Sequence, residues 1–281
     1  MTAPLFHLAP GALDAVEAGS RVLVDGAEGH HAATVMRLAP EEEIVLSDTR
    51  DRRAEGVVTA VGSGELTVEV RRVDVEPRPA PQLVLVQALA KDRRDVQAIE
   101  SATELGVERI VPWSAERSVA RWKPGREAKK HAEWVSTVRT AAKQTRRTAI
   151  PEVEALHTTA QLAERIASSA DLAAVVLHET EEHTLAEALT ALGLSPAGAA
   201  GGMDGTSGSE GTGGTTLQTL LLLVGPEGGI SEAEISRLSE AGAGSARLGP
   251  SVLRSSTAGP AALTAVQVLL GRWDRPSADG Q

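Results

Sequence analysis

The residues most able to do chemistry lie in the stretch 220–265. An apolar run ends at Val224 and leads directly into the sequence Gly-Pro-Glu-Gly-Gly at 225–229. Glycine has no Cβ, so backbone amides and carbonyls at these positions can approach a ligand closely. Ser231, with Glu234 three residues later, forms a capping signature that predicts the start of a helix. The stretch predicts either a ligand-contacting loop between a strand and a helix or a plain tight turn.

A second break in the same region favours the ligand-contacting loop. Leu248-Gly249-Pro250 ends another expected strand, and a further helix is expected to begin near Ser256 or Thr257. In open parallel sheets, ligands bind in crevices at the carboxyl ends of strands. Two such loops close together therefore predict a site for one small molecule. The pattern matches neither the phosphate-binding loop of nucleotide hydrolases nor the dinucleotide-binding fingerprint.

The histidines do not predict a metal site. His178 and His183 are five residues apart, whereas zinc chelation on one helix face needs a spacing of four. His30 and His31 have no acidic or histidine partners at ligand spacing. The chain has no cysteine, which excludes disulfides, thiolate nucleophiles and cysteine zinc sites. We expect no metal, but the backbone at His178 follows a predicted strand and is a plausible ligand contact.

The charge is unevenly distributed along the chain. The net charge of −10 over 281 residues argues against a general polyanion binder, yet residues 117–147 carry ten lysines and arginines against two glutamates. Such a segment can hold a phosphate backbone, although a solvated basic helix face has the same composition. No apolar run approaches the roughly 20 residues of a membrane span, and the start lacks the features of a signal peptide. We expect a soluble, cytoplasmic protein without membrane contact.

The elements that would position these residues fall into two regions. Residues 20–73 are expected to be all-β, because short apolar runs alternate with turns. We assign residues 1–74 to a small β domain and the proline-rich residues 75–81 to a stiff linker. From residue 82 to 275 strands alternate with helices, which predicts an α/β domain with a mainly parallel sheet. Residues 193–216 are low-complexity and are predicted to form a disordered surface insertion.

The expected elements can be given by their ranges. The strands of the first domain are Arg21–Val24, Glu43–Leu46, Ala54–Val61 and Glu65–Val73. The strands of the second are Leu83–Leu89, Glu108–Trp113, Leu172–His178, Leu220–Val224 and Ser245–Leu248, with helices at Asp95–Leu105 and Gly125–Arg147.

These motifs together resemble the ribosomal RNA small subunit methyltransferase E family, in order and over nearly the whole chain. The matching residues are His30-His31, Val35-Met36-Arg37-Leu38, Thr103-Glu104-Leu105-Gly106-Val107, Ile110, Pro112, Glu116-Arg117-Ser118-Val119, Gln144, Arg147, Pro151, residues 225–229, Leu248-Gly249, Leu253-Arg254 and Thr257-Ala258. Two positions depart from the family pattern. Ser256 stands where a glutamate is usual, so no carboxylate role is assigned there. Residues 140–143, Thr-Ala-Ala-Lys, stand where acidic residues are usual.

The resemblance implies a fold and an assembly. The second domain would be a SPOUT-type methyltransferase domain with a C-terminal trefoil knot, a rare exception to unknotted topology. The first domain would be a PUA-like β-barrel that binds RNA. Members of the family are homodimers, and their cofactor lies against the loops of the knot.

The resemblance also implies an activity, S-adenosylmethionine-dependent methylation of uridine N3 in 16S ribosomal RNA, with the RNA inside the small ribosomal subunit. The implied cofactor-binding residues are Leu177, His178, Val224, Gly225, Pro226, Glu227, Gly228, Gly229, Leu248, Gly249 and Leu253. The expected RNA-binding residues are Arg37, Lys91, Arg93, Arg121, Lys123, Gln144 and Arg147.

Arg254 is the expected catalytic residue, because a guanidinium can stabilise negative charge developing on a uracil oxygen. In the alternative readings it only closes the knot loop or pairs with Glu227. Two rival functions stay open. One is another activity of the SPOUT class, on a ribose 2′-oxygen or on guanine. The other is a non-catalytic ribosome-assembly factor that binds RNA.

Overall fold

The computed structural model describes residues 3–194 and 217–273. The predicted insertion therefore lies outside the described residues, apart from Gly193 and Leu194. By its contacts the chain divides into two units. The first unit comprises Met1–Pro79 and Arg139–Pro151, and the second comprises Ala80–Val138 and Glu152–Gln281.

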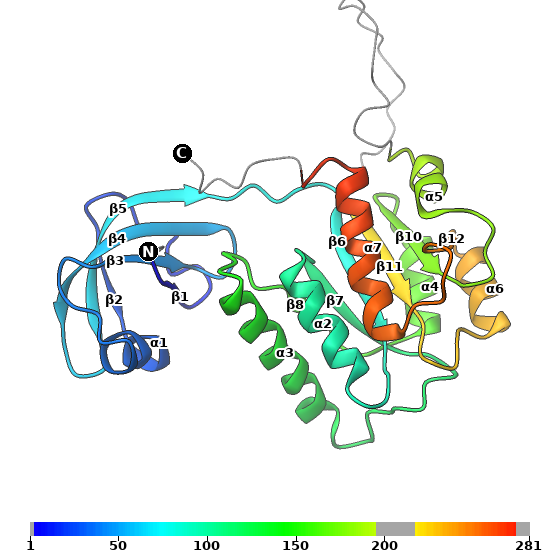
Figure 1. Ribbon diagram of the computed structural model, residues 1–281, viewed down its shortest axis with the longest axis horizontal. Coiled ribbons are helices and arrows are strands. Elements are labelled where there is room, and N and C mark those ends of the chain that lie inside the picture. The colour runs from blue at the N-terminus through cyan, green and yellow to red at the C-terminus, as the bar shows by residue number, and fades with distance from the viewer. Residues whose placement is uncertain (1–2, 195–216, 274–281) are drawn as a thin grey trace, which may run out of the picture. The chain divides into compact units, whose positions relative to one another are not determined.

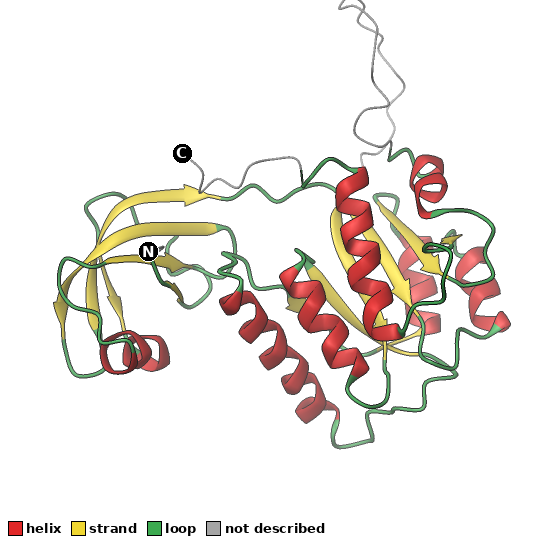
Figure 2. Cartoon of the chain, in the orientation of Figure 1, coloured by secondary structure: helices red, strands yellow, loops and turns green. Residues whose placement is uncertain are grey.

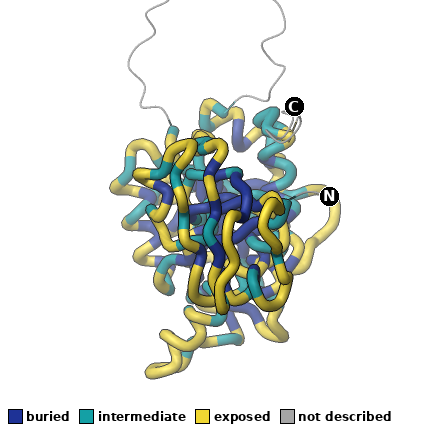
Figure 3. The backbone as a smooth tube through the Cα atoms, turned by 90° about the vertical axis from the view of Figure 1, so that its left-hand side faces the viewer, coloured by how far each residue is buried: buried dark blue, intermediate teal, exposed yellow. Residues whose placement is uncertain are grey.

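The first unit contains a five-stranded sheet in the order β1-β3-β4-β5-β2. Its strands are β1 (Leu5–His7), β2 (Arg21–Val24), β3 (Glu43–Ser47), β4 (Arg52–Val61) and β5 (Leu66–Val75). All pairs are antiparallel except β1 with β3. Leu66, Val68 and Val70 are buried while residues between them are more exposed, as the alternation predicted. Figure 3 shows buried and exposed stretches of backbone side by side. Phe6 and Leu13 belong to the same hydrophobic core as these buried strand residues.

The all-β expectation for residues 20–73 is wrong at one place. A short helix, α1 (Gly26–His30), continues into a π-helical turn, η1 (His31–Val35). Gly29 allows this turn to sit against the sheet, since a Cβ there would come within 2.7 Å of the carbonyl oxygen of Gly64. Ala32 then buries its small side chain in the core. Strand β1 was not predicted either.

The second unit is built on a seven-stranded parallel sheet, so the α/β prediction is confirmed. The order is β12-β10-β11-β6-β7-β8, and β9 also pairs with β7. The strands are β6 (Gln82–Ala88), β7 (Arg109–Ser114), β8 (Glu152–Val153), β9 (His157–Thr158), β10 (Leu172–Leu177), β11 (Thr219–Val224) and β12 (Gly244–Ala246). Leu83 and Leu220 on one face and Val84 and Leu221 on the other are all fully buried, as expected of strands covered on both faces.

Helices cover the sheet on both faces (Figures 1 and 2). They are α2 (Arg94–Glu104), α4 (Thr159–Ser168), α5 (Leu185–Ala191), α6 (Glu232–Glu240) and α7 (Ser255–Leu269). The remaining long helix, α3 (Glu127–Gln144), begins in the second unit and ends in the first. Helices α4 and α6 pack together against a core that includes Val84 and Val86. Helices α2 and α7 pack together over the opposite face of β6. Gly259 brings α7 close to the sheet, because a Cβ there would lie 2.8 Å from Leu85 Cδ1.

The strand order reverses beside β6, and this reversal creates the site. The chain runs outward from β6 to β7 and β8, then crosses to β10 on the other side. Strand β11 returns between β10 and β6, and β12 adds to the outer edge. Such a switch point leaves a crevice outside the carboxyl ends of the strands.

Candidate functional site

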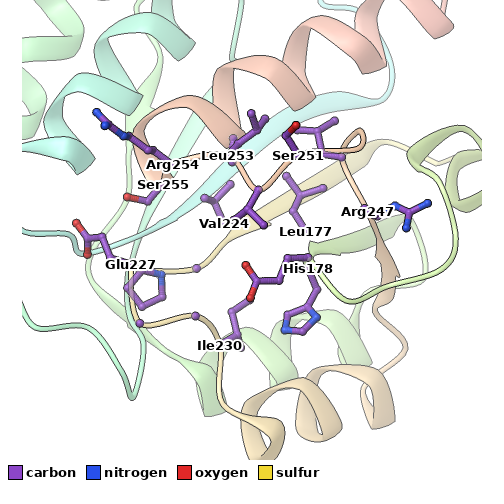
Figure 4. A pocket seen from close by; sticks show the side chains of 18 of the residues that line it. Leu177, His178, Val224, Glu227, Ile230, Arg247, Ser251, Leu253, Arg254 and Ser255 are labelled. Carbon is purple, nitrogen blue, oxygen red and sulfur yellow. The ribbon is translucent and has the colours of Figure 1, made fainter.

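A cavity of about 470 Å³ lies at the carboxyl ends of β10, β11 and β12 (Figure 4). Three loops form it, after Leu177, after Val224 and after Ala246. Its lining is Arg94, Arg117, Leu177, His178, Glu179, residues 224–230, residues 247–255 and Ala258. The volume is within the range of small-molecule sites in proteins.

The residues predicted to contact a cofactor all line this cavity. They are Leu177, His178, Val224, Gly225, Pro226, Glu227, Gly228, Gly229, Leu248, Gly249 and Leu253. Arg254 lines it too. These residues are brought together because β10, β11 and β12 are parallel neighbours, so their following loops meet at one edge.

The loop at 225–229 needs its glycines. A Cβ on Gly225 would lie 2.6 Å from Ile230 Cγ1, inside the loop itself. Gly229 has φ of +73°, a conformation that costs other residues energy. A Cβ on Gly228 would lie 3.1 Å from the carbonyl oxygen of Arg117, so the chain after β7 packs directly on this loop. The conformation and packing of the loop itself therefore account for all three glycines.

A buried carboxylate holds these two segments together. Ser231 caps α6 and forms the predicted capping box with Glu234. Glu234, only 6% exposed, also accepts hydrogen bonds from the Thr159 hydroxyl at 2.6 Å and the Glu116 amide at 2.9 Å. The Ser231 hydroxyl donates to the Glu116 carboxylate. Position and orientation of the glycine loop therefore depend on residues from α4, α6 and the segment after β7.

The charged groups at the cavity pair in a way that sequence reasoning missed. Arg94 Nη1 lies 3.2 Å from Glu227 Oε1, so Glu227 is paired with Arg94. Within the described residues, the Arg254 side chain is exposed and has no hydrogen-bond or ion-pair partner. Its pairing with Glu227, one of the two structural alternatives, is not observed. Figure 4 shows Arg254 and Arg247 at opposite sides of the cavity.

Ser255 is a second residue that the sequence did not reveal. It lines the cavity, is 7% exposed, and its hydroxyl oxygen has no partner within the described chain. A buried hydroxyl without a partner is costly, so a polar group in the cavity would satisfy it. The signals close to this residue were the Leu253-Arg254 motif and the departure from the family pattern at Ser256.

The residues predicted to bind RNA do not form one cluster within a unit. Lys91, Arg93, Arg121 and Lys123 belong to the second unit, and Arg37, Gln144 and Arg147 to the first. Arg121 donates to the carbonyls of Ala115 and Glu116, at 2.8 and 2.7 Å, so its guanidinium supports the backbone of that loop.

The other cations divide into exposed and paired ones. Arg93 is ion-paired with Glu133. Lys91, Lys123 and Arg37 are exposed, and Arg37 has a φ of +56°.

The part of the chain that the structure describes offers neither a metal site nor a membrane-spanning helix. No group of three or more His, Asp or Glu side chains there is placed to hold a metal ion. Across residues 3–194 and 217–273, every helix is too short or too polar to cross a membrane.

Comparison with known proteins adds independent findings. Residues 76–267 match the family pattern of the RNA methyltransferase domain, and residues 24–71 match that of the RNA methyltransferase PUA domain. Ribosomal RNA small subunit methyltransferase E of Mycobacterium bovis is 40% identical, covering 94% of this chain and 92% of its own. The protein of that name from Bacillus subtilis is 28% identical, covering 89% and 91%. The expected PUA-like and methyltransferase domains are thus confirmed.

A solved structure shows the same fold. The Ribosomal RNA small subunit methyltransferase E from Neisseria gonorrhoeae, crystallised bound to S-adenosyl methionine, superimposes with a TM-score of 0.73. It is 23% identical, and the match covers 95% of this chain and 98% of that one.

Proposed function

The chain belongs to the ribosomal RNA small subunit methyltransferase E family, and from this membership we propose that it methylates 16S ribosomal RNA with S-adenosylmethionine as the methyl donor. The observation that carries the proposal is the cavity formed by the glycine loop and its two neighbouring loops. It lies at the strand-order switch, where open α/β sheets bind their ligands.

The chemistry of the lining fits this donor. Leu177, Val224 and Leu253 offer apolar surface for the cofactor's apolar parts. The loop at 225–229 offers backbone groups at close range, and the unpaired Ser255 hydroxyl offers a polar contact. When bound, S-adenosylmethionine supplies a methyl group already activated on a sulfonium. The protein's own task is then mainly alignment of donor and acceptor.

The proposed acceptor is N3 of a uridine. Neutral uracil carries a proton on N3 and is a poor nucleophile there, so the reaction builds negative charge on the uracil oxygens as that proton leaves. Arg254 is suited to stabilise this charge, because its guanidinium stands at the cavity without a protein partner. Glu227 does not neutralise it, since Arg94 already pairs with Glu227.

The assembly is also part of the proposal. We infer a homodimer whose C-terminal segment, from β11 to α7, is threaded as a trefoil knot around the cofactor cavity. The exposed cations Lys91, Lys123 and Arg37 would contact the RNA backbone, and Arg93, Arg121, Gln144 and Arg147 would support or extend that surface. The substrate would be the RNA inside the small ribosomal subunit in the cytoplasm.

The deciding experiment uses small ribosomal subunits from cells that lack this gene. Purified protein and methyl-labelled S-adenosylmethionine are added, and the digested RNA is analysed by mass spectrometry. We expect label in 3-methyluridine at one site. Label on a ribose or on guanine would keep the methyltransferase function and refute the N3 chemistry. No label, together with no cofactor binding, would favour a ribosome-assembly factor.

A further inference from the structure

A second cavity, of about 650 Å³, lies wholly within the first unit. It is formed by the end of β1, the start of α1 and η1, and the last turns of α3. Its lining is His7, Leu8, Ala9, Pro10, Asp25, Ala27, Glu28, His31, Thr49, Arg139, Thr140, Lys143 and Gln144. No residue of the first cavity takes part.

The charges at this cavity are balanced, which argues against a site for a bare phosphate. Arg139 and Lys143 face Asp25 and Glu28. Lys143 Nζ lies 2.8 Å from both carboxylate oxygens of Glu28 and 5.5 Å from the centre of the Phe6 ring. Its charge is therefore already neutralised. What remains is a mixed set of donors and acceptors, which suits a neutral ligand with several hydrogen-bonding edges.

His7 contributes an acceptor. Its Nε2 donates to the carbonyl oxygen of Arg147 at 2.8 Å, so the proton of the neutral ring is on Nε2. Burial lowers the pKa of His7, which keeps the ring neutral. Its Nδ1 is then a lone-pair acceptor, buried and without a partner within the described residues. A donor on a ligand in the cavity would satisfy it.

His31 contributes a flat surface. It is half-buried at the cavity, and its ring is supported from within by Phe6, whose centroid is 6.1 Å away. None of the four tryptophans of the chain lines this cavity, so the His31 ring is the aromatic surface that its lining offers beside His7. Gln144, exposed at the end of α3, adds an amide with both a donor and an acceptor.

We propose that this cavity binds one unstacked nucleobase of the RNA substrate, as an anchoring site separate from the cofactor cavity. The proposal rests on the proposed function in that the ligand is RNA. Sequence-specific RNA recognition commonly uses splayed-out bases that stack on a ring and are hydrogen-bonded at their edges. His31 supplies the ring, and His7 and Gln144 supply edge contacts.

The test measures binding of two RNA probes to the full chain. One is a decamer of randomised base sequence, and the other is an abasic ribose-phosphate decamer of the same length. The variant is His31→Ala, and the matched control is His30→Ala, an exposed neighbour that does not line the cavity. Gln144→Ala is a second variant that removes an exposed side chain and leaves the Phe6 contact intact.

The expected result is specific to the base. His31→Ala should weaken binding of the base-containing decamer about tenfold, the scale of one lost stacking contact, and Gln144→Ala should weaken it less. Neither variant should change binding of the abasic decamer. The control His30→Ala should leave binding of both decamers unchanged. Equal losses for both probes, an equal loss in His30→Ala, or no loss in either cavity variant would overturn the inference. Failure of methyl transfer to ribosomal subunits, with base-dependent binding intact, would refute the proposed function alone.

Discussion

Replacing Arg254 by alanine isolates the proposed catalytic contact. The side chain is exposed and has no described partner, so its loss should change the free energy of unfolding by no more than about 0.5 kcal/mol. Its backbone carbonyl accepts the amides of Thr257 and Ala258 at 2.8 and 2.9 Å, and these bonds at the start of α7 remain in the variant. The structure thus predicts a folded protein with an intact cofactor cavity.

The expected loss is in turnover. Removing one donor to a developing oxyanion costs about 10²- to 10³-fold in kcat. Because the Arg254 guanidinium is exposed to water, we expect the lower end, about 10²-fold. Single-turnover methylation of unmodified small subunits measures the rate, and calorimetry measures the affinity for S-adenosylmethionine, which should change little. Arg254→Lys keeps the charge without the planar fork, so it should recover part of the rate.

Arg247 provides the matched control. It is also an exposed arginine that lines the same cavity, at the side opposite to Arg254 (Figure 4). Arg247→Ala should therefore keep most of its turnover. An unchanged rate in Arg254→Ala, or an equal loss in both variants, would refute the reasoning that Arg254 acts on the acceptor.

Three further outcomes follow from buried groups. Glu234→Ala removes the acceptor of the Thr159 hydroxyl and the Glu116 amide. Thermal unfolding should therefore show a Tm lower by roughly 5–15 °C, equivalent to about 2–4 kcal/mol of stability. An unchanged Tm would contradict a stabilising role for this network. Gly229→Ala places a Cβ at a residue with φ of +73°. Chemical denaturation should show a free energy of unfolding lower by about 1–2 kcal/mol, and cofactor binding should be weaker. Burial lowers the pKa of His7, so the unfolded state binds more protons and stability should fall as pH drops below about 6.5. His7→Gln should flatten this fall, and a variant with the same pH dependence as the unmodified protein would refute the assignment.

The sequence revealed the local parts of the site because they depend on short-range rules. The apolar run ending at Val224 predicted β11, and the glycines predicted the loop that follows it. Ser231 and Glu234 predicted the start of α6, which the structure confirms as a capping box. Helix α7 begins at Ser255, one residue earlier than the expected start, because the Arg254 carbonyl accepts the first amide bonds.

What the sequence did not reveal depends on contacts between distant residues. The ion pair of Arg94 with Glu227 joins positions 133 apart in sequence, and no local pattern marks it. Helix α1 lies in a glycine-containing segment with weak helical propensity. It forms because Gly29 fits against the sheet, which only the folded unit determines.

Local and long-range contacts have different roles in the site. The backbone of three loops shapes the cofactor cavity, and residues outside the cavity, such as Glu234 and Glu116, hold those loops in place. Loss of Glu234 should therefore act through cofactor affinity and stability, since it touches neither reacting group. Arg254 is different, because it is held by its backbone while its side chain is left unpaired. Substitution of Arg254 should thus lower turnover at saturating cofactor. Substitutions in the network beneath the glycine loop should instead weaken cofactor binding.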